Sequence, residues 1–228
     1  MNLAANASII IDYYKTYFHN VDDVDIIFEI GANNLEDTRR LHSGFPNAAI
    51  FAFEPRLVNA IEVNDKVKVF PIALSDVPED NKKFYIPVGW EGASSLLKPK
   101  KEPGVKWTME KEIREISVHV DTANNFCKKN NIEKIDVVWM DVQGNELRVL
   151  KGMTNFLADI KMIQTEAGVR EYYENHTLFS DIEEFLKPYG FEVVYNILEG
   201  GREFKDGITW EFETDVIFVN KNKLEVNL

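Results

Sequence analysis

The chain has 228 residues with 45% apolar and 12% aromatic side chains, which suits one folded domain with a substantial core and excludes a disordered chain. Its formal net charge of −12 disfavours a nucleic-acid partner, because phosphate binding needs a basic face. The single cysteine, Cys127, excludes an internal disulfide and fits a reducing compartment, and its helical neighbours favour a buried position over a nucleophile.

The sequence carries no pattern typical of export or membrane insertion. No basic segment precedes a long apolar core, and no apolar run is long enough to span a bilayer. We therefore expect a cytoplasmic protein without a membrane span. Residues 1–228 are predicted to form a single domain, with an N-terminal helix within residues 1–22 and an insertion of edge strand and loop over residues 84–120.

Residues 6–19 are predicted to form a helix with a broad apolar face. Ile9, Tyr13 and Tyr17 follow one another at intervals of four residues on that face. We expect the helix to pack against the main sheet. The alternative is that one of its tyrosines closes the ligand pocket.

Residues 25–34 are predicted to form a buried strand, a tight turn and the start of a helix. A short apolar run rich in β-branched residues stops at Gly31, and an asparagine pair opens the helical segment. Such a turn leaves backbone N–H groups free to bind a ligand. The helix is expected to continue through Leu35, Thr38 and Leu41.

A second apolar run, residues 48–53, ends on Glu54. An acid at the tip of the second strand of a nucleotide-binding unit accepts hydrogen bonds from ribose hydroxyls. The alternative is a solvated acid at a strand end; its register with the glycine turn favours ribose binding. Pro55 suits the first turn of a helix, whose buried stripe would be Leu57 and Ile61.

A third strand over residues 67–72 continues the alternation of strand and helix, which predicts a parallel, doubly wound sheet with a ligand across the carboxyl ends of its strands. This alternation then breaks. Residues 84–88 contain a proline and are predicted to form an edge strand, and residues 89–115 form a long loop. Three lysines of this loop either steer an anionic sugar or form a solvated surface: Lys98, Lys100 and Lys101.

The later elements alternate again between strands and helices. Asp121 or Thr122 is positioned to cap a helix, and Ser180 with Glu183 has the spacing of a capping box. The predicted strands cover residues 116–120, 135–140, 161–165, 191–197 and 215–220, and the predicted helices cover residues 123–130, 145–151 and a segment around residues 182–189.

The glycine turn lacks the second glycine of a dinucleotide fingerprint, since Gly31 is followed by Ala-Asn-Asn at residues 32–34. A pyrophosphate must approach the backbone closely, so this turn disfavours a dinucleotide. S-adenosylmethionine has no phosphate and needs less room. Its methionine carboxylate would bind the N–H groups of the turn, and its ribose would bind Glu54.

Five segments, in this order, resemble the FkbM-type methyltransferases over roughly residues 24–195. The resemblance implies a Rossmann-like class I methyltransferase fold: an α/β domain with a seven-stranded, mostly parallel sheet whose last strand is antiparallel, helices on both faces, extra edge strands and a lid-like insertion. It also implies S-adenosylmethionine as cofactor and O-methylation of saccharides or polyketide-type small molecules. The segments are Glu29–Asn33, Phe53–Pro55, Ala73–Asp76, Ser94–Leu96 and the most specific, Asp141–Gly152.

By position, the resemblance implies three groups of cofactor-binding residues. The methionine end would be held by Gly31, Ala32 and Asn33. The ribose would be held by Glu54. The adenine would lie along Leu74, Ser75 and Asp76, with the last accepting from its exocyclic amine. The predicted set is completed by Glu29, Pro55 and Asp141.

The chain departs from the family pattern at two positions. Glu29 stands where the family usually has Asp, a mild change between carboxylates at a strand end. Gln143 stands where the family usually has Glu, which removes a charge close to the expected reaction centre. A metal or base role at position 143 is therefore in doubt.

A hydroxyl that attacks a sulfonium needs in-line placement and a base for its proton. Asp141 follows the fourth core strand as a candidate base or substrate contact, and its alternative role is a cap on the next helix. Glu166 ends the neighbouring strand and would face the same cleft, and His176 follows in a polar segment. The two carboxylates could hold a divalent cation, but no third ligand is evident and we predict no metal.

The leading hypothesis is an S-adenosylmethionine-dependent O-methyltransferase that acts on a hydroxyl of a small molecule or saccharide, with no nucleic-acid partner. One alternative is an RNA ribose 2′-O-methyltransferase, although a lysine would be wanted in place of Glu166 and the net charge is wrong. Another is a non-catalytic module that binds S-adenosylmethionine, which Gln143 motivates.

Overall fold

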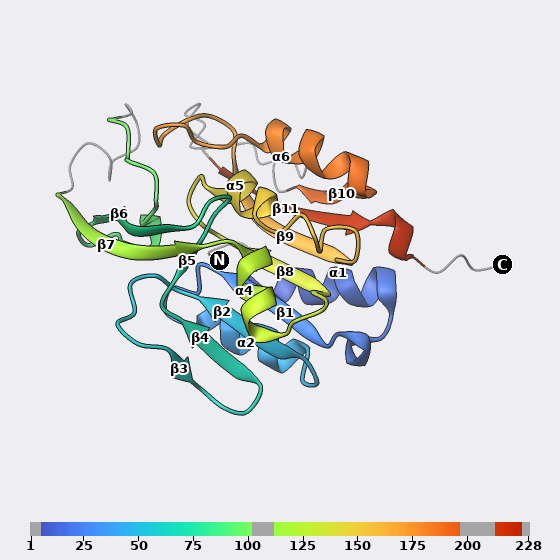
Figure 1. The fold of residues 1–228 in the computed structure, drawn as a ribbon. Helices are drawn as coiled ribbons and strands as arrows, with labels where there is room; N and C mark the ends of the chain where they lie inside the picture. The colour runs from blue at the N-terminus through green and yellow to red at the C-terminus, as the bar shows by residue number, and fades with distance from the viewer. Residues whose placement is uncertain (1–5, 102–111, 197–212, 225–228) are drawn as a thin grey trace.

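The computed structural model describes residues 6–101, 112–196 and 213–224, and its centre is an eight-stranded sheet in the order β10-β11-β9-β8-β1-β2-β4-β3 (Figure 1). The strands of this sheet are β1 (Ile26–Ile30), β2 (Ala49–Phe53), β3 (Ile61–Glu62), β4 (Val67–Phe70), β8 (Val137–Met140), β9 (Met162–Gly168), β10 (Phe191–Asn196) and β11 (Glu213–Asn220). A second, three-stranded sheet in the order β5-β7-β6 contains β5 (Ala73–Leu74), β6 (Glu79–Pro87) and β7 (Ile113–Asp121).

Five α-helices accompany the two sheets in the described part of the chain: α1 (Ser8–Phe18), α2 (Glu36–Gly44), α4 (Ala123–Asn130), α5 (Glu146–Lys151) and α6 (Phe179–Leu186). Short 3₁₀ turns lie at Val21–Asp23, Glu91–Ala93, Lys187–Tyr189 and Lys221–Lys223. None of the helices in these ranges is long and apolar enough to cross a bilayer.

The strand directions follow the predicted class I arrangement. β1, β2, β4, β8 and β9 pair in parallel, and β11 runs antiparallel between β9 and β10. The sheet has one strand more than the predicted seven, because β3 pairs antiparallel with β4 at the edge. The alternation of strand and helix therefore predicted the parallel core, and the extra strand is a local addition.

The helix predicted after Glu54 is absent, and this prediction was wrong. The backbone N–H of Arg56 donates to Oε1 of Glu54 at 2.9 Å, which holds the chain in a turn. Of the expected apolar stripe, Leu57 packs against the core from this turn, whereas Ile61 is 39% exposed. Here a local hydrogen bond from the backbone to a side chain stabilises the turn more than helix propensity would stabilise a helix.

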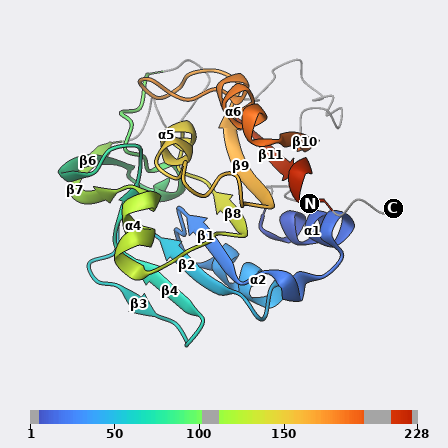
Figure 2. The ribbon, with the colours of Figure 1, turned by 45° about the vertical axis from the view of Figure 1, so that its right-hand side comes forward.

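Helices lie on both faces of the main sheet (Figure 2), and a hydrophobic core fills the space on each face. Alternate residues of each central strand supply them: Phe28 enters the core beneath α4, α5 and α6, whereas its neighbour Ile27 enters the core beneath α1 and α2. Cys127 is fully buried in the first core, as predicted, and burial raises the pKa of its thiol to about 12. Helix α1 packs on the sheet, where its Ile10 N–H donates to Gln164.

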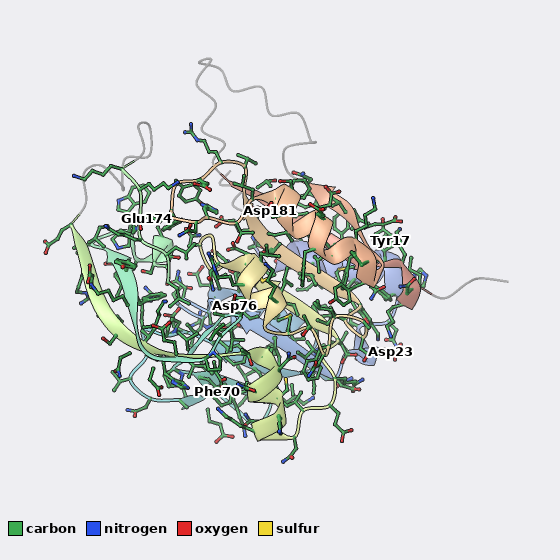
Figure 3. All side chains as sticks on the ribbon, turned by 45° about the horizontal axis from the view of Figure 1, so that its top comes forward. Tyr17, Asp23, Phe70, Asp76, Glu174 and Asp181 are labelled. Atoms are coloured by element: carbon green, nitrogen blue, oxygen red, sulfur yellow. The ribbon has the colours of Figure 1, made fainter. Side chains whose placement is uncertain are left out.

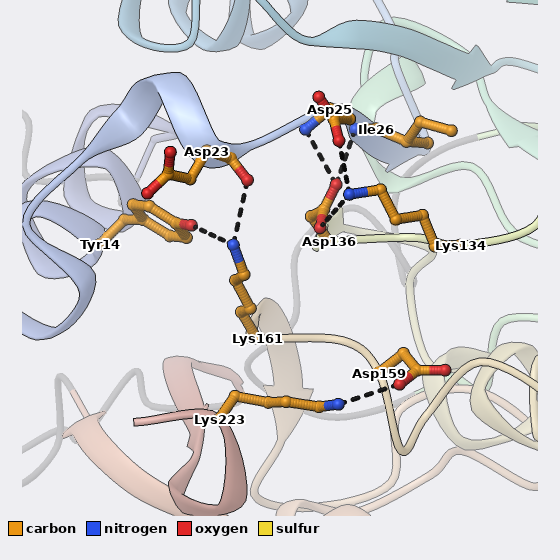
Figure 4. A network of polar contacts seen from close by, with 9 residues as sticks. All are labelled: Tyr14, Asp23, Asp25, Ile26, Lys134, Asp136, Asp159, Lys161 and Lys223. Carbon is orange, nitrogen blue, oxygen red and sulfur yellow. Dashed lines mark hydrogen bonds and ion pairs between the residues drawn. The ribbon is translucent and has the colours of Figure 1, made fainter. Parts of the chain in front are cut away.

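The amino ends of the central strands are fixed by a polar network (Figure 4). Oδ2 of Asp136, just before β8, accepts from the backbone N–H groups of Asp25 and Ile26 at 2.9 Å each. Nζ of Lys161 donates to the Tyr14 hydroxyl at 3.1 Å and to a backbone carbonyl at 3.0 Å. These contacts set the register of β1 against β8 and so bring their carboxyl ends together at the opposite edge.

Two predicted helix caps had different outcomes. Thr122 caps α4, because its Oγ1 accepts from the backbone N–H of Asn125 at 3.0 Å. The capping box predicted for Ser180 and Glu183 was wrong, since α6 begins one residue before Ser180. Oδ2 of Asp181 instead accepts from the backbone N–H of Leu178 at 3.1 Å.

Candidate functional site

The carboxyl ends of β1, β2, β4 and β8 border a cleft that encloses about 610 Å³, part of it open to solvent. This is the edge at which a doubly wound sheet binds its ligands. Six of the predicted site residues line the cleft: Gly31, Asn33, Glu54, Pro55, Leu74 and Asp141. Six others are not among its lining residues: Glu29, Ala32, Ser75, Asp76, Glu166 and His176.

Gly31 allows the turn after β1 to pass directly over the end of β8. Its φ is +95°, and a Cβ at this position would lie 1.9 Å from the backbone carbonyl oxygen of Asp141. Only glycine fits such a conformation and such an approach without strain. The glycine is therefore required by the meeting of two backbone segments, whereas the sequence suggested a ligand-binding role.

The backbone N–H groups of this turn are not free, contrary to the prediction. Those of Gly31 and Ala32 both donate to the carbonyl oxygen of Phe53, at 2.9 and 3.0 Å. That of Asn33 donates to Oε2 of Glu54 at 2.8 Å. These bonds join the end of β1 to the end of β2, and they leave the side chain of Asn33, rather than the turn amides, at the cleft.

Glu54 is held in place at the tip of β2 and is only 4% exposed, which rules out a solvated strand-end acid. Its Oε1 accepts from Nε of Arg56 at 2.8 Å, and a terminal nitrogen of Arg56 donates to Oδ1 of Asn33 at 2.5 Å. Another terminal nitrogen of Arg56 reaches the backbone carbonyl of Glu91 at 3.2 Å. Arg56 thus links both strand ends to the insertion, a role that the sequence analysis missed.

An apolar wall of the cleft is formed by Phe53, Ile72, Leu74, Phe84 and Leu96. Such a combination of apolar surface and few polar groups is typical of a small-ligand site. Ser75 and Asp76 line instead an adjoining hollow, which Glu174 also lines. Asp76 and Glu174 are labelled in Figure 3. Asp76, predicted to contact the adenine, therefore lies outside the lining of the cleft.

Glu29 lies inside β1 and is fully buried beneath the cleft. Its carboxylate lies next to Thr38 of α2, which lowers its pKa, but burial has the larger effect. Burial raises its pKa to about 8, so that the neutral form dominates at neutral pH. Its predicted contact with the cofactor has no counterpart in the cleft lining.

Asp141 and Glu166 come together through an amide that lies between them. Nε2 of Gln143 donates to Oδ1 of Asp141 at 2.7 Å and to Oε2 of Glu166 at 2.5 Å. Glu166 lies within β9, which runs on to Gly168, rather than at the strand end as predicted. Burial raises the pKa of Asp141. The sequence placed both acids near one another, but the bridging role of Gln143 was missed.

Asp141 does not cap the following helix, the alternative role considered for it. Oε1 of Glu146, the first residue of α5, instead accepts from the backbone N–H groups of Val142 and Gly144, at 3.2 and 3.1 Å. Burial raises the pKa of Glu146 to about 8. The carboxylate of Asp141 is thus left for the cleft and for Gln143.

His176 packs beneath the turn that carries Gln143 and is only 5% exposed. Its ring lies edge-on to Tyr172, with centroids 4.3 Å apart, and a Cβ on Gly168 would lie 2.3 Å from its Nε2. Burial lowers the pKa of His176 to about 4. These contacts favour a supporting role over the predicted role as base.

A buried neutral histidine gives the stability a pH dependence. Between the unfolded pKa near 6.5 and the folded pKa of about 4, the unfolded chain binds a proton that the folded protein does not. The free energy of unfolding therefore falls as the pH is lowered through this window. His176→Gln is expected to remove at most about 3 kcal/mol of that fall, measured by urea unfolding at both ends of the window. An unchanged slope would contradict this assignment.

Comparisons with known proteins place this sequence among methyltransferases. The family model described as "Methyltransferase FkbM domain" matches residues 29–193. The 2-O-methyltransferase NoeI of Sinorhizobium fredii (strain NBRC 101917 / NGR234) is 29% identical over 187 residues, which cover 77% of this chain and 75% of that protein.

Solved structures that are similar to this chain have low sequence identity. A putative ribosomal RNA methyltransferase from Plasmodium falciparum has a TM-score of 0.43 at 9% identity, with 95% of this chain and 97% of that chain covered. The precorrin-6y C5,15-methyltransferase from Geobacter metallireducens GS-15 has a TM-score of 0.42 at 13% identity, with 93% and 88% covered.

Proposed function

The chain belongs to the FkbM methyltransferase family, and we propose that it transfers a methyl group from S-adenosylmethionine to a hydroxyl of a saccharide or another small molecule. The observation that carries the proposal is the cleft, where a buried acid, an apolar wall and the carboxylate of Asp141 lie around one hollow. A relative named as a 2-O-methyltransferase supports oxygen as the methylated atom.

The residues that line the cleft fit the chemistry of this cofactor. Glu54 would accept hydrogen bonds from the ribose hydroxyls, and the apolar wall around Leu74 would cover the adenine. Asn33 and Asp141 would bind the methionine end through their side chains, since the turn amides are already paired. The cofactor supplies an electrophilic methyl group, and everything else in the reaction is positioning and proton transfer by this chain.

Asp141, which lines the cleft, is proposed to receive the proton of the acceptor hydroxyl, and Glu166 is linked to it through the amide of Gln143. Burial raises the pKa of Asp141, which makes its carboxylate a better base than an exposed aspartate. His176 is a poorer candidate, because its pKa is lowered to about 4 and it does not line the cleft. Within the described ranges, no three His, Cys, Asp or Glu side chains converge as a metal site would require.

An acceptor panel tests the proposal. The protein is incubated with S-adenosylmethionine that carries an isotope-labelled methyl group, together with saccharides, hydroxylated small molecules, amines and RNA. We expect the label on a hydroxyl oxygen of a saccharide or small molecule, located by mass spectrometry and NMR. Label recovered on nitrogen, on carbon or on RNA would contradict the proposal.

A further inference from the structure

The amide of Gln143 forms a set of hydrogen bonds that a side chain with only a packing role would not need. It is buried, and its φ of 55° lies in the left-handed region that long side chains rarely adopt. Both donors of its amide are used, one by Asp141 and one by Glu166. Its Oε1 faces the hydroxyl of Tyr173, which donates to it at 3.0 Å. Such a strained position persists only where its surroundings fix it.

An amide instead of a carboxylate at position 143 leaves the cluster of residues 141, 143 and 166 with two ionisable acids rather than three. Asp141 and Glu166 are acceptor-only when ionised, and the two N–H bonds from Gln143 offset part of their repulsion. An ionised carboxylate at position 143 would have no hydrogen-bond donor, and it would add a third negative charge that repels those of Asp141 and Glu166. One of three such acids would be forced to stay protonated.

We propose that Gln143 is a positioning residue that joins Asp141 and Glu166 into one proton-accepting unit. This inference rests on the proposed function and gives it a specific device. The acceptor's O–H bond breaks, its proton forms a new O–H bond with a carboxylate oxygen of the pair, and the pair loses one negative charge. The electron pair left on the acceptor oxygen would form the new O–CH3 bond as the S–CH3 bond of the sulfonium breaks. The single hydroxyl proton of Tyr173 is shared between Oε1 of Gln143 at 3.0 Å and the backbone carbonyl of Ala93 at 2.7 Å, which links the amide to the insertion.

Asp141 is surrounded mainly by other acidic groups, so the N–H donors of Gln143 have a large effect on its pKa. Glu166 and Tyr173 face it from β9 and the loop that follows, Glu146 from α5, and Asp37 from α2. Burial and Asp37 raise the pKa of Asp141, whereas its hydrogen bonds with Gln143 and with Glu166 lower it. Without the bond from Gln143, the carboxylate would hold its proton to a higher pH and would be a base over a narrower range.

A double-mutant cycle on the ligand-free protein tests the unit directly. Gln143→Glu adds a third carboxyl and is expected to lower the Tm above neutral pH by about 4–8 °C. Adding Glu166→Gln returns the group to two carboxyls and one amide, so most of that loss should be recovered. If the two effects simply add, the three side chains are not a unit and the inference is overturned.

Asn220 provides a matched control for the cycle. It is a fully buried amide at the far end of β11, and its Nδ2 donates to the carbonyl of Ile160 at 3.0 Å. Asn220→Asp buries a carboxylate in the same way but far from Glu166. Glu166→Gln should therefore leave its loss of Tm unchanged, and recovery there would overturn the inference.

The pH profile of kcat separates a positioning role from a structural one. In Gln143→Glu the acid limb should move to higher pH by about one unit, with kcat reduced about tenfold on that limb, and the double variant with Glu166→Gln should move back. An acid limb that stays at the wild-type pH would overturn the inference. Failure of the wild type to bind S-adenosylhomocysteine would instead overturn the proposed function, because the ligand-free cycle still decides whether the unit exists.

Discussion

Glu54→Ala is expected to weaken the binding of S-adenosylhomocysteine by about 100-fold or more, measured by titration calorimetry. A hydrogen bond to a charged group contributes about 1.5–3 kcal/mol, and two ribose hydroxyls would lose this partner. The change also removes the partner of Arg56, whose Nε lies 2.8 Å from Oε1 of Glu54. An uncompensated guanidinium would then stand at the cleft, which adds to the loss.

Two further variants separate binding from folding in this experiment. Glu54→Gln keeps the shape of the side chain but not its charge, and we expect an intermediate loss of affinity. Glu62→Ala removes an exposed acid of β3, whose Oε1 lies 3.3 Å from Nζ of Lys68. This variant should leave the affinity for S-adenosylhomocysteine unchanged. A Glu54→Ala protein with the wild-type Tm and the wild-type affinity would contradict the ribose-binding role.

Gly31→Ala is expected to produce the largest loss of stability. Its Cβ would lie 1.9 Å from a backbone oxygen of Asp141, which cannot rotate away, and the φ of +95° is strained for alanine. Strain and overpacking each cost about 1–3 kcal/mol, so a total of about 3 kcal/mol would lower the Tm by roughly 6–12 °C in a chain of this size.

Gly92→Ala is the matched control, because Gly92 lines the same cleft. A Cβ there would meet its nearest neighbour, Nδ2 of Asn33, at 3.8 Å, which is ordinary van der Waals contact. We expect its Tm to stay close to that of the wild type. Equal Tm values for the two variants would contradict the account of Gly31 as the point where the ends of β1 and β8 meet.

The helices and strands that were predicted correctly are those in which the spacing of apolar residues marks the buried face. Helix α4 runs from Ala123 to Asn130 as predicted, with Thr122 as its cap. The parallel core was predicted because its strands are short apolar runs that alternate with helices. The position of Glu54 at the cleft was also predicted, because it directly follows an apolar run that forms a strand, and the carboxyl end of that strand lies at the cleft.

The failed predictions depended on hydrogen bonds that the sequence pattern does not reveal, one of them local and the others between residues far apart in the chain. The turn after β2 follows from the bond between Glu54 and the Arg56 amide, which outweighs a weak helical pattern. The turn amides of β1 looked free because the carbonyl of Phe53, more than twenty residues away, is not visible as their partner in the local sequence.

The candidate reaction centre shows the same limit. Tyr173 and Gln143 lie thirty residues apart and meet only because the loop after β9 folds back over the end of β8. His176 carried a plausible chemical signal, but its burial against Gly168 could not be read from composition. The departure at Gln143 was visible in sequence, and only the structure gave it a partner on each side.

Hydrogen–deuterium exchange with and without S-adenosylhomocysteine tests most directly whether the cleft is the cofactor site. We predict slower exchange in the peptides that contain residues 30–35, 53–56, 72–74, 91–96 and 141–146, because these segments surround the cleft. The ends of the strands near Asp136 and Lys161 should be unchanged. Protection confined to that opposite edge, or no protection anywhere, would contradict the account.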